Sequence, residues 1–280
     1  MRVLNCAIFL AFIVNTVLTF LSNTGAYGHT NSELSKKYQT LATPAGWAFS
    51  IWGVIFSLQG IYAVAQLLPS FRDADEVTRA GPWFAAACIF QAAWSVTFGH
   101  ECIVAAQVLI LSILVSLWRT NFVLNTVAKA TPPTFGRYFL LYLPFSIHFG
   151  WLTAASVVST NLTLVAYAPS AHVTLLAVAI ASLTVVFLPA FSGSDSAYAL
   201  TVAWALTAVF AQLQSPKDDA PAADPIKSWC PPLVTESLSI VALTLAFAVI
   251  ASVLVRQGQK IWSHARSPAD VKLSDLLMTA

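Results

Sequence analysis

Charged side chains are scarce in this chain. Asp, Glu, Lys and Arg together make up 9% of its 280 residues, whereas hydrophobic residues make up 58%. A soluble domain carries roughly a quarter charged residues, so this chain has too few charges to cover a globular surface. The composition excludes a soluble domain and predicts an integral membrane protein whose surroundings are the lipid bilayer.

The motifs of common catalytic, nucleotide and metal sites are also missing. The chain has no P-loop, no Gly-x-Gly-x-x-Gly after a strand, no His-Glu-x-x-His and no Gly-x-Ser-x-Gly. Its few cysteines form no metal or redox pattern: Cys6, Cys88, Cys102 and Cys230. The formal charge of +2 comes from scattered loop residues and gives no basis for nucleic-acid binding. We therefore predict no catalytic residue, no metal, no cofactor and no enzymatic activity.

What the chain does have is a series of long apolar runs. They cover residues 3–22, 45–68, 82–99, 102–119, 138–160, 172–191, 196–213 and 234–256, and each is long enough, or nearly so, to cross a bilayer. Lipid tolerates only helices or closed barrels, and the runs show no period-two alternation. The predicted fold class is all-α, with residues 1–280 forming one polytopic bundle of about eight transmembrane helices.

The first run has two interpretations. Arg2, the apolar residues after it and Thr24-Gly25-Ala26 fit a signal peptide with a small-residue cleavage site. The run is, however, about spanning length and carries Asn15 in its middle, which favours a retained helix that packs in the bundle.

Lysine and arginine are unevenly divided between the two sides of the predicted bundle. The side that carries both termini has ten, and the opposite side has four, Lys36, Lys37, Lys217 and Lys227. The positive-inside rule then predicts that both termini are cytoplasmic. The glycosylation sequon that begins at Asn161 falls on the outer side. The identity of the membrane does not follow from the sequence.

An aromatic-rich stretch, residues 43–53 (Thr-Pro-Ala-Gly-Trp-Ala-Phe-Ser-Ile-Trp-Gly), opens the second run. Thr43 suits a helix N-cap, and Pro44 suits the first turn, where its missing N–H group is not needed. Trp47 and Trp52 fall at the depth of an aromatic belt, so on position alone they are interface anchors.

Polar side chains in the third run predict a face that points into the bundle. Gln91, Trp94, Ser95 and Phe98 follow the i, i+3, i+4, i+7 spacing of one helix face. A glutamine at this depth is costly against lipid, so we expect this face to line the bundle interior.

In the fifth run, Pro144 predicts a kink, and His148, Trp151 and Ala155 share one helix face. His148 is the one titratable side chain well inside any run, which makes it a functional candidate. The alternative is a structural histidine that is hydrogen-bonded across helices, because no run has a carboxylate partner in its interior.

Three motifs carry a resemblance to a known family. They are Pro-Ala-Gly-Trp-x-Phe-Ser-Ile-Trp-Gly at 44–53, Gln-x-x-Trp-Ser-x-x-Phe at 91–98 and Pro-Phe-Ser-x-x-x-Gly-Trp-x-Thr at 144–153. In this order they resemble the tryptophan-rich sensory protein, or translocator-type (TspO/MBR-related), membrane protein superfamily, in its longer branch with extra C-terminal helices. The resemblance covers roughly residues 10–212. It implies a five-helix core over 1–164, three additional transmembrane helices over 165–256 and a cytoplasmic tail over 257–280.

The resemblance also implies a pocket for tetrapyrroles, sterols or other hydrophobic ligands that is lined by aromatic side chains. The residues that match the family position by position are Pro44, Trp47, Phe49, Trp52, Trp94, Ser95, Phe98 and Pro144. The chain departs from the short members of the family at Gln91, where they carry Asn, and at His148, where they carry Trp. These departures bear on the identity of the ligand more than on the fold.

Together, the residues and the resemblance predict a membrane receptor or carrier for a hydrophobic small molecule, a tetrapyrrole or a sterol-like lipid. The predicted ligand-binding residues are Trp47, Phe49, Trp52, Gln91, Trp94, Ser95, Phe98, His148 and Trp151. Secondary active transport of a small solute, photochemical breakdown of a porphyrin and a structural role in a membrane complex stay open as alternatives, and so does a homo-oligomer.

Overall fold

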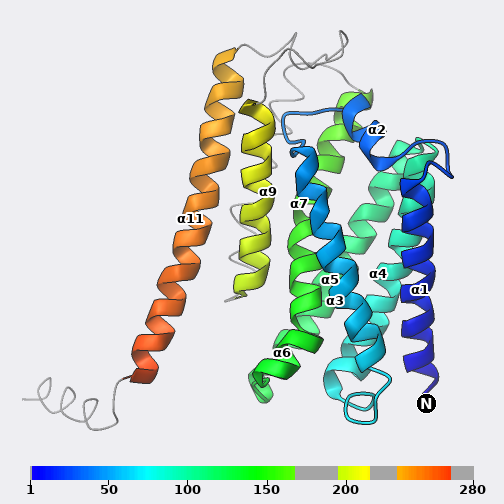
Figure 1. Cartoon of the computed structure of the whole chain (residues 1–280), viewed down its shortest axis with the longest axis vertical. Coiled ribbons are helices and arrows are strands. Elements are labelled where there is room, and N and C mark those ends of the chain that lie inside the picture. The colour runs from blue at the N-terminus through cyan, green and yellow to red at the C-terminus, as the bar shows by residue number, and fades with distance from the viewer. Residues whose placement is uncertain (1, 168–194, 215–231, 266–280) are drawn as a thin grey trace, which may run out of the picture.

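The computed structural model describes residues 2–167, 195–214 and 232–265 (Figure 1). These ranges contain helices and turns but no strand, which confirms the predicted all-α class. The elements are α1 (Val3–Asn23), α2 (Asn31–Lys37), the 3-10 helix η1 (Gly46–Ser50), α3 (Ile51–Ala65), α4 (Asp75–Gly99), α5 (Ile103–Ala130), α6 (Phe135–Leu141), α7 (Leu143–Tyr167), α9 (Ser196–Gln214) and α11 (Pro232–Ala265).

Six helical stretches in the described ranges are long and apolar enough to cross a membrane. They are α1, η1 with α3, α5, α7, α9 and α11. α4, which contains the predicted span 82–99, is not among them. The predicted span 172–191 lies outside the described residues. The chain is nevertheless a multi-pass helical membrane protein.

The long helices pack mostly against their neighbours in sequence (Figure 1). α4 lies between α1 and α5, α7 lies between α5 and α9, and α11 packs against α9. α7 and α9 run parallel, since the first turn of α7 contacts the start of α9 through a 2.5 Å hydrogen bond from Ser146 to Asp195. The N-terminal end of α1 and the C-terminal end of α11 lie at the same end of the bundle. That this end is cytoplasmic stays a prediction.

The start of the second span differs from the prediction. Thr43 does not cap a helix; its hydroxyl accepts a hydrogen bond from the backbone N–H of Thr40 and closes a turn there. The helix begins three residues later, as η1, and becomes α-helical at Ile51. The preceding stretch is fastened to α9 instead, because the Ala45 N–H donates to the Ala208 carbonyl over 2.9 Å.

Pro144 interrupts the fifth span instead of kinking it. α6 ends at Leu141, and α7 begins at Leu143, so Pro144 takes the second position of a new helix, where its missing N–H group is not needed. Two helices also continue past their predicted ends: α5 runs beyond Arg119 to Ala130, and α11 runs beyond residue 256 to Ala265. The predicted tail therefore begins as helix.

Asn161 is buried within α7, where its side-chain amide donates to the Val157 carbonyl over 3.0 Å. The predicted sequon is thus part of a packed helix and not of an outer loop.

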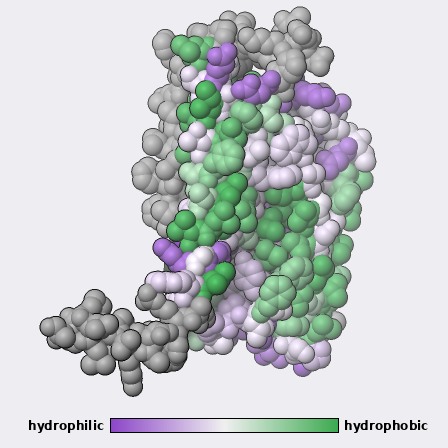
Figure 2. Space-filling model, turned by 60° about the vertical axis from the view of Figure 1, so that its left-hand side comes forward, coloured by the Kyte–Doolittle hydropathy of each residue, from purple (hydrophilic) through white to green (hydrophobic). Residues whose placement is uncertain are grey.

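The two largest apolar clusters of the described residues lie at different heights in the bundle. One contains Ile55, Ile113 and Leu152, and the second contains Ile8, Phe84 and Phe145. In the second core the rings of Phe84 and Phe145 meet at 5.0 Å between centroids. The outer surface matches a bilayer, because hydrophobic side chains cover the middle of the face shown in Figure 2 and hydrophilic ones gather toward its ends.

Candidate functional site

A cavity of about 160 Å³ lies between α4, α5, α7, α9 and α11, below the loop that follows α2. Its wall from η1, α3, α4 and α7 is aromatic, whereas its wall from α9 and α11 is aliphatic. Residues of the aromatic wall are Phe49, Trp52, Trp94, Phe98 and Trp151; residues of the aliphatic wall include Val202, Leu206, Val209, Leu238, Val241 and Leu245. α2 and the loop contribute Asn31, Ser35 and Tyr38 at the mouth.

A second cavity, of about 890 Å³, lies on the other side of the aromatic wall, between α1 and α3. Its lining is more polar and includes Thr19, Asn23, Lys36, Gln39 and Ser57. The residues common to both cavities come from η1, α3 and α4 in particular: Phe49, Trp52, Gln91 and Trp94. α2 and the loop after it contribute four more shared residues, Asn31, Ser35, Thr43 and Pro44, so the two cavities adjoin along the three aromatic rings and the Gln91 amide and beneath this loop.

The aromatic rings brace one another at angles that proteins favour. Trp94 stacks on Phe98 with 5.0 Å between centroids, and Trp151 meets Phe49 and Trp52 edge-on at 5.7 and 6.2 Å. α4 can present Trp94 and Phe98 on one face because they are four residues apart. The wall is thus a fixed set of flat apolar surfaces.

Three polar atoms on this wall have no hydrogen-bond partner among the described residues. They are Gln91 Oε1 and the indole Nε1 atoms of Trp94 and Trp151, and all three are buried. A buried polar atom left unpaired costs roughly 1–3 kcal/mol, and most such atoms in proteins are paired. The residues that line the cavity therefore carry one acceptor and two donors that no described protein group uses.

Six of the nine predicted residues line a cavity: Phe49, Trp52, Gln91, Trp94, Phe98 and Trp151. The other three do not. Trp47 is 45% exposed and packs edge-on against Trp204 at 4.7 Å, on the outer side of η1. The spacing from Trp47 to Trp52 turns the two rings to different sides of the chain.

Ser95 and His148 lie behind the wall, where protein groups already contact them. The Ser95 hydroxyl lies 3.1 Å from that of Thr19 on α1 and donates to the Gln91 carbonyl. His148 Nδ1 lies 2.7 Å from Gln59 Nε2 on α3, and its ring meets Trp52 edge-on at 5.6 Å. His148 positions Trp52 from behind instead of touching the cavity, in line with a histidine that is hydrogen-bonded across helices.

Sequence reasoning missed Gln59 and the whole aliphatic wall. Gln59 had a usable signal, since a glutamine in the middle of an apolar run is costly against lipid and is here fully buried. The aliphatic residues gave no signal of this kind.

The mouth of the first cavity is held by an ion-pair cluster outside the spans. Glu101, in the turn between α4 and α5, accepts a 2.5 Å hydrogen bond from Lys37 at the end of α2, and His29 lies 3.7 Å from its other oxygen. The hydrogen bond from Lys37 lowers the pKa of Glu101 and, in return, raises the pKa of Lys37. A capping box between Thr30 and Glu33 fixes the start of α2 and lowers the pKa of Glu33.

No group of three His, Cys, Asp or Glu side chains in the described ranges could hold a metal ion.

Comparison with known proteins gives one match. A family model described as TSPO-like protein matches residues 3–255, which bears out the superfamily that the three motifs indicated. No curated protein and no solved structure matches the chain.

Proposed function

This chain belongs to the TSPO-like protein family, and from that premise we propose that it is a receptor or carrier that binds a flat, mostly apolar molecule, a tetrapyrrole or a sterol-like lipid. The ligand would lie against the wall formed by Phe49, Trp52 and Trp94. Binding or transport, and not catalysis, is the activity that the family supports.

The observation that carries the proposal is the set of three unpaired polar atoms in an otherwise apolar, aromatic wall. Flat rings suit stacking against Trp and Phe, and burial of apolar area supplies most of the affinity. The two indole N–H groups of Trp94 and Trp151 suit a carboxylate, carbonyl or hydroxyl oxygen of the ligand, and Gln91 Oε1 suits a hydroxyl or pyrrole N–H. These contacts would fix the orientation of the ligand.

Cavity size supports a ligand that reaches both sides of the shared wall. Small-molecule pockets typically measure about 300–1,000 Å³. The cavity beside α9 and α11, at about 160 Å³, is below that range, whereas the one beside α1 and α3, at about 890 Å³, is within it. A tetrapyrrole-sized body would occupy the wider cavity and extend one edge or substituent past Trp52 and Trp94 into the narrower one.

The test is a titration of the purified full chain in detergent with protoporphyrin IX, haem and a sterol, followed by quenching of tryptophan fluorescence. We expect saturable quenching by at least one of them and an affinity that falls about tenfold or more in Trp94→Ala, because the substitution removes a stacking surface and a donor. Trp262→Ala is the matched control, since Trp262 is 61% exposed near the end of α11. Equal affinity in Trp94→Ala, Trp151→Ala and the wild type would refute the proposal.

Trp47→Ala separates the family pattern from the structure. The family pattern places Trp47 in the pocket, whereas the structure packs it against Trp204. Unchanged affinity supports the cavity as described, and a loss as large as that of Trp94→Ala would mean that the ligand binds on the other side of η1. Ligand flux in proteoliposomes distinguishes a carrier, which moves the ligand, from a receptor, which only retains it.

A further inference from the structure

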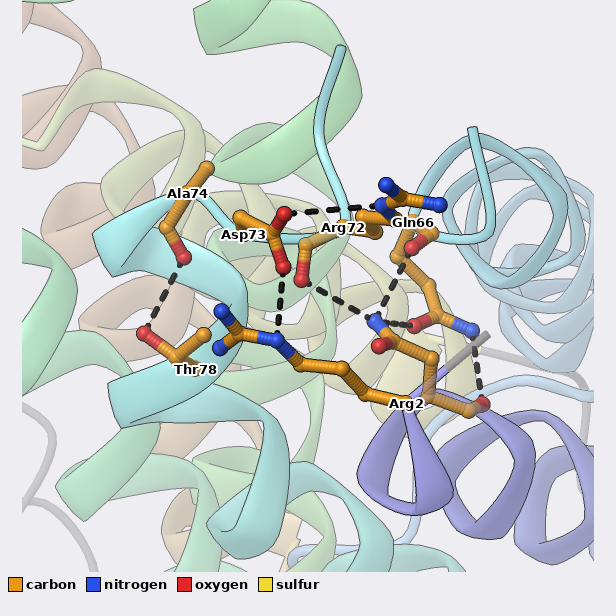
Figure 3. A network of polar contacts seen from close by, with 7 residues as sticks. Arg2, Gln66, Arg72, Asp73, Ala74 and Thr78 are labelled. Carbon is orange, nitrogen blue, oxygen red and sulfur yellow. Dashed lines mark hydrogen bonds and ion pairs between the residues drawn. The ribbon is translucent and has the colours of Figure 1, made fainter. Parts of the chain in front are cut away.

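Arginines in the range 2–167 differ in how their charge is balanced. Four of the five pair with a carboxylate within 4.0 Å: Arg2 and Arg72 with Asp73, Arg79 with Asp75, and Arg137 with Glu76. Figure 3 shows Arg2 and Arg72 converging on Asp73 in the loop before α4. The fifth, Arg119 on α5, makes no ion pair or hydrogen bond in the part of the chain that the structure describes.

Aromatic rings surround Arg119 where the other arginines have carboxylates. Its guanidinium carbon lies 5.1 Å from the ring centroid of Trp83 on α4, and 5.8 and 5.6 Å from those of Trp118 and Phe122 on α5. All three rings are on the outer surface, with 37, 45 and 54% of their area exposed. Such rings attract a cation and shield it from water, but they do not neutralise its charge.

Arg119 lies at the edge of the apolar part of the bundle. The side-chain amide of Asn121, two residues further along α5, donates to the carbonyl of Phe145 over 3.2 Å. Phe145 is in the first turn of α7, whose spanning segment starts at Leu143. The guanidinium is therefore level with the start of a spanning helix, the depth at which lipid headgroups begin.

Above Arg119, α5 presents an apolar strip to the outside. Val115, Leu111 and Val108 lie four, eight and eleven residues earlier on the same helix face and are 54, 42 and 59% exposed. In the described structure, then, the unpaired guanidinium of Arg119 lies at headgroup depth, at the end of an apolar strip. A phospholipid has the complementary arrangement, an anionic phosphate at the end of apolar chains.

We propose that Arg119, with Trp83, Trp118 and Phe122, binds the phosphate of a phospholipid whose acyl chains lie along the α5 strip. Because the N–H groups of Arg119 make no hydrogen bond or ion pair with the described residues, they are available for two parallel hydrogen bonds to phosphate oxygens. The low polarity of the surroundings strengthens this charge-assisted contact relative to one in water. The site is independent of the cavity between α4 and α7.

The test is native mass spectrometry of the full chain in detergent, titrated with phosphatidylglycerol, with the dissociation constant of the first bound lipid as the readout. We expect that constant to rise about tenfold or more in Arg119→Gln. Arg119→Lys should recover only part of the affinity, because an ammonium group neither stacks nor forms two parallel hydrogen bonds. Arg79→Gln is the matched control, since Arg79 is another arginine near the same end of the bundle but is paired with Asp75.

Three outcomes would overturn the assignment. Wild-type affinity in Arg119→Gln would mean that the guanidinium serves only to pack the aromatic rings. An equal loss in Arg79→Gln would mean that the lipid responds to net charge and not to this site. Displacement of the lipid by inorganic phosphate at matching concentration would identify a site for the free anion. Protoporphyrin IX quenching should be unchanged in Arg119→Gln, which also verifies that the variant is folded.

Discussion

The two walls of the narrower cavity are built from different chemistry. The wall from α3, α4 and α7 consists of aromatic rings that carry unpaired polar atoms, among them the indole N–H groups of Trp94 and Trp151. The wall from α9 and α11 consists of aliphatic side chains, such as Leu206 and Leu245, that have no polar atom to offer. The first wall can select a ligand by shape and hydrogen bonding, whereas the second can only bury area.

The two walls are joined by close helix contact at Gly150. An added Cβ there would lie 2.9 Å from the Tyr198 carbonyl oxygen on α9 and 2.9 Å from Thr201 Cβ. Backbone atoms at that distance cannot rotate away, so the small residue is what lets α9 approach α7. The distance between the aromatic and the aliphatic wall thus depends on one position.

The largest effect is therefore expected from Gly150→Ala, which should force α9 and its aliphatic wall away from Trp151. Overpacking of this kind typically costs about 1–3 kcal/mol, so we expect a lower melting temperature in detergent together with weaker ligand quenching. Gly258→Ala on α11 is the matched control, because nothing lies within 4 Å of a Cβ there. Wild-type melting and affinity in Gly150→Ala would mean that the walls are not coupled through this contact.

A smaller effect, but one specific to the ligand, is expected when the walls are changed one at a time. Trp151→Phe keeps an aromatic surface and removes the N–H donor, so a ligand with an acceptor should lose about 1 kcal/mol, roughly a fivefold rise in Kd. An analogue without that acceptor should bind as before. Leu245→Val removes one methylene group and should weaken both ligands alike, by less than about 0.8 kcal/mol.

The comparison of the two ligands decides whether the indole N–H group of Trp151 contacts the ligand. Isothermal titration of the acceptor-bearing ligand and its analogue against both variants gives four affinities. If Trp151→Phe and Leu245→Val shift the two ligands in the same ratio, the indole N–H group makes no contact and the division of roles between the walls is wrong.

The same difference between the walls explains what the sequence could predict. The aromatic wall could be predicted because Trp is concentrated in three motifs. In addition, Gln91 is costly against lipid, so its helix face had to point inward. Val202 and Leu206 could not be predicted as cavity residues. An aliphatic side chain is equally compatible with a cavity and with lipid, so the sequence does not distinguish the two. Their role follows from how α9 packs on α7, which depends on contacts between segments far apart in sequence.

Local predictions failed where tertiary contacts compete with a local preference. Thr43 has the chemistry of an N-cap, but its hydroxyl closes a turn with Thr40, and the chain beyond it is held by α9. Trp47 matches the family motif, yet its ring packs against Trp204, on the side of η1 that faces away from the cavity. The five-helix core over 1–164 remains a prediction, as does the sidedness of the bundle.

The smallest effect is expected at α2, which lines both cavities through Asn31 and Ser35. The pKa of Glu101 is lowered by its hydrogen bond from Lys37, so this contact stabilises the position of α2 at neutral pH and is lost as the pH falls through the lowered value. The raised pKa of Lys37 matters at high pH, where the contribution of this contact to the stability of α2 is lost as the pH rises through that raised value. Around neutral pH the Lys37–Glu101 pair is fully formed. Because the pair is exposed to solvent, its contribution to stability is small and sensitive to salt.

Hydrogen exchange of residues 31–45 should therefore rise as the pH is lowered from about 7 to below about 4, the ordinary range of a glutamate, once rates are corrected for intrinsic exchange. Glu101→Gln should show the higher rate already at neutral pH. Any acid dependence left in that variant should vanish in Glu33→Gln/Glu101→Gln, because the lowered pKa of Glu33 falls in the same window. Since the two cavities share this roof, ligand should also enter and leave faster in Glu101→Gln, by the same factor whether it has an acceptor for Trp151 or not. A change confined to the acceptor-bearing ligand would instead assign α2 to the aromatic wall.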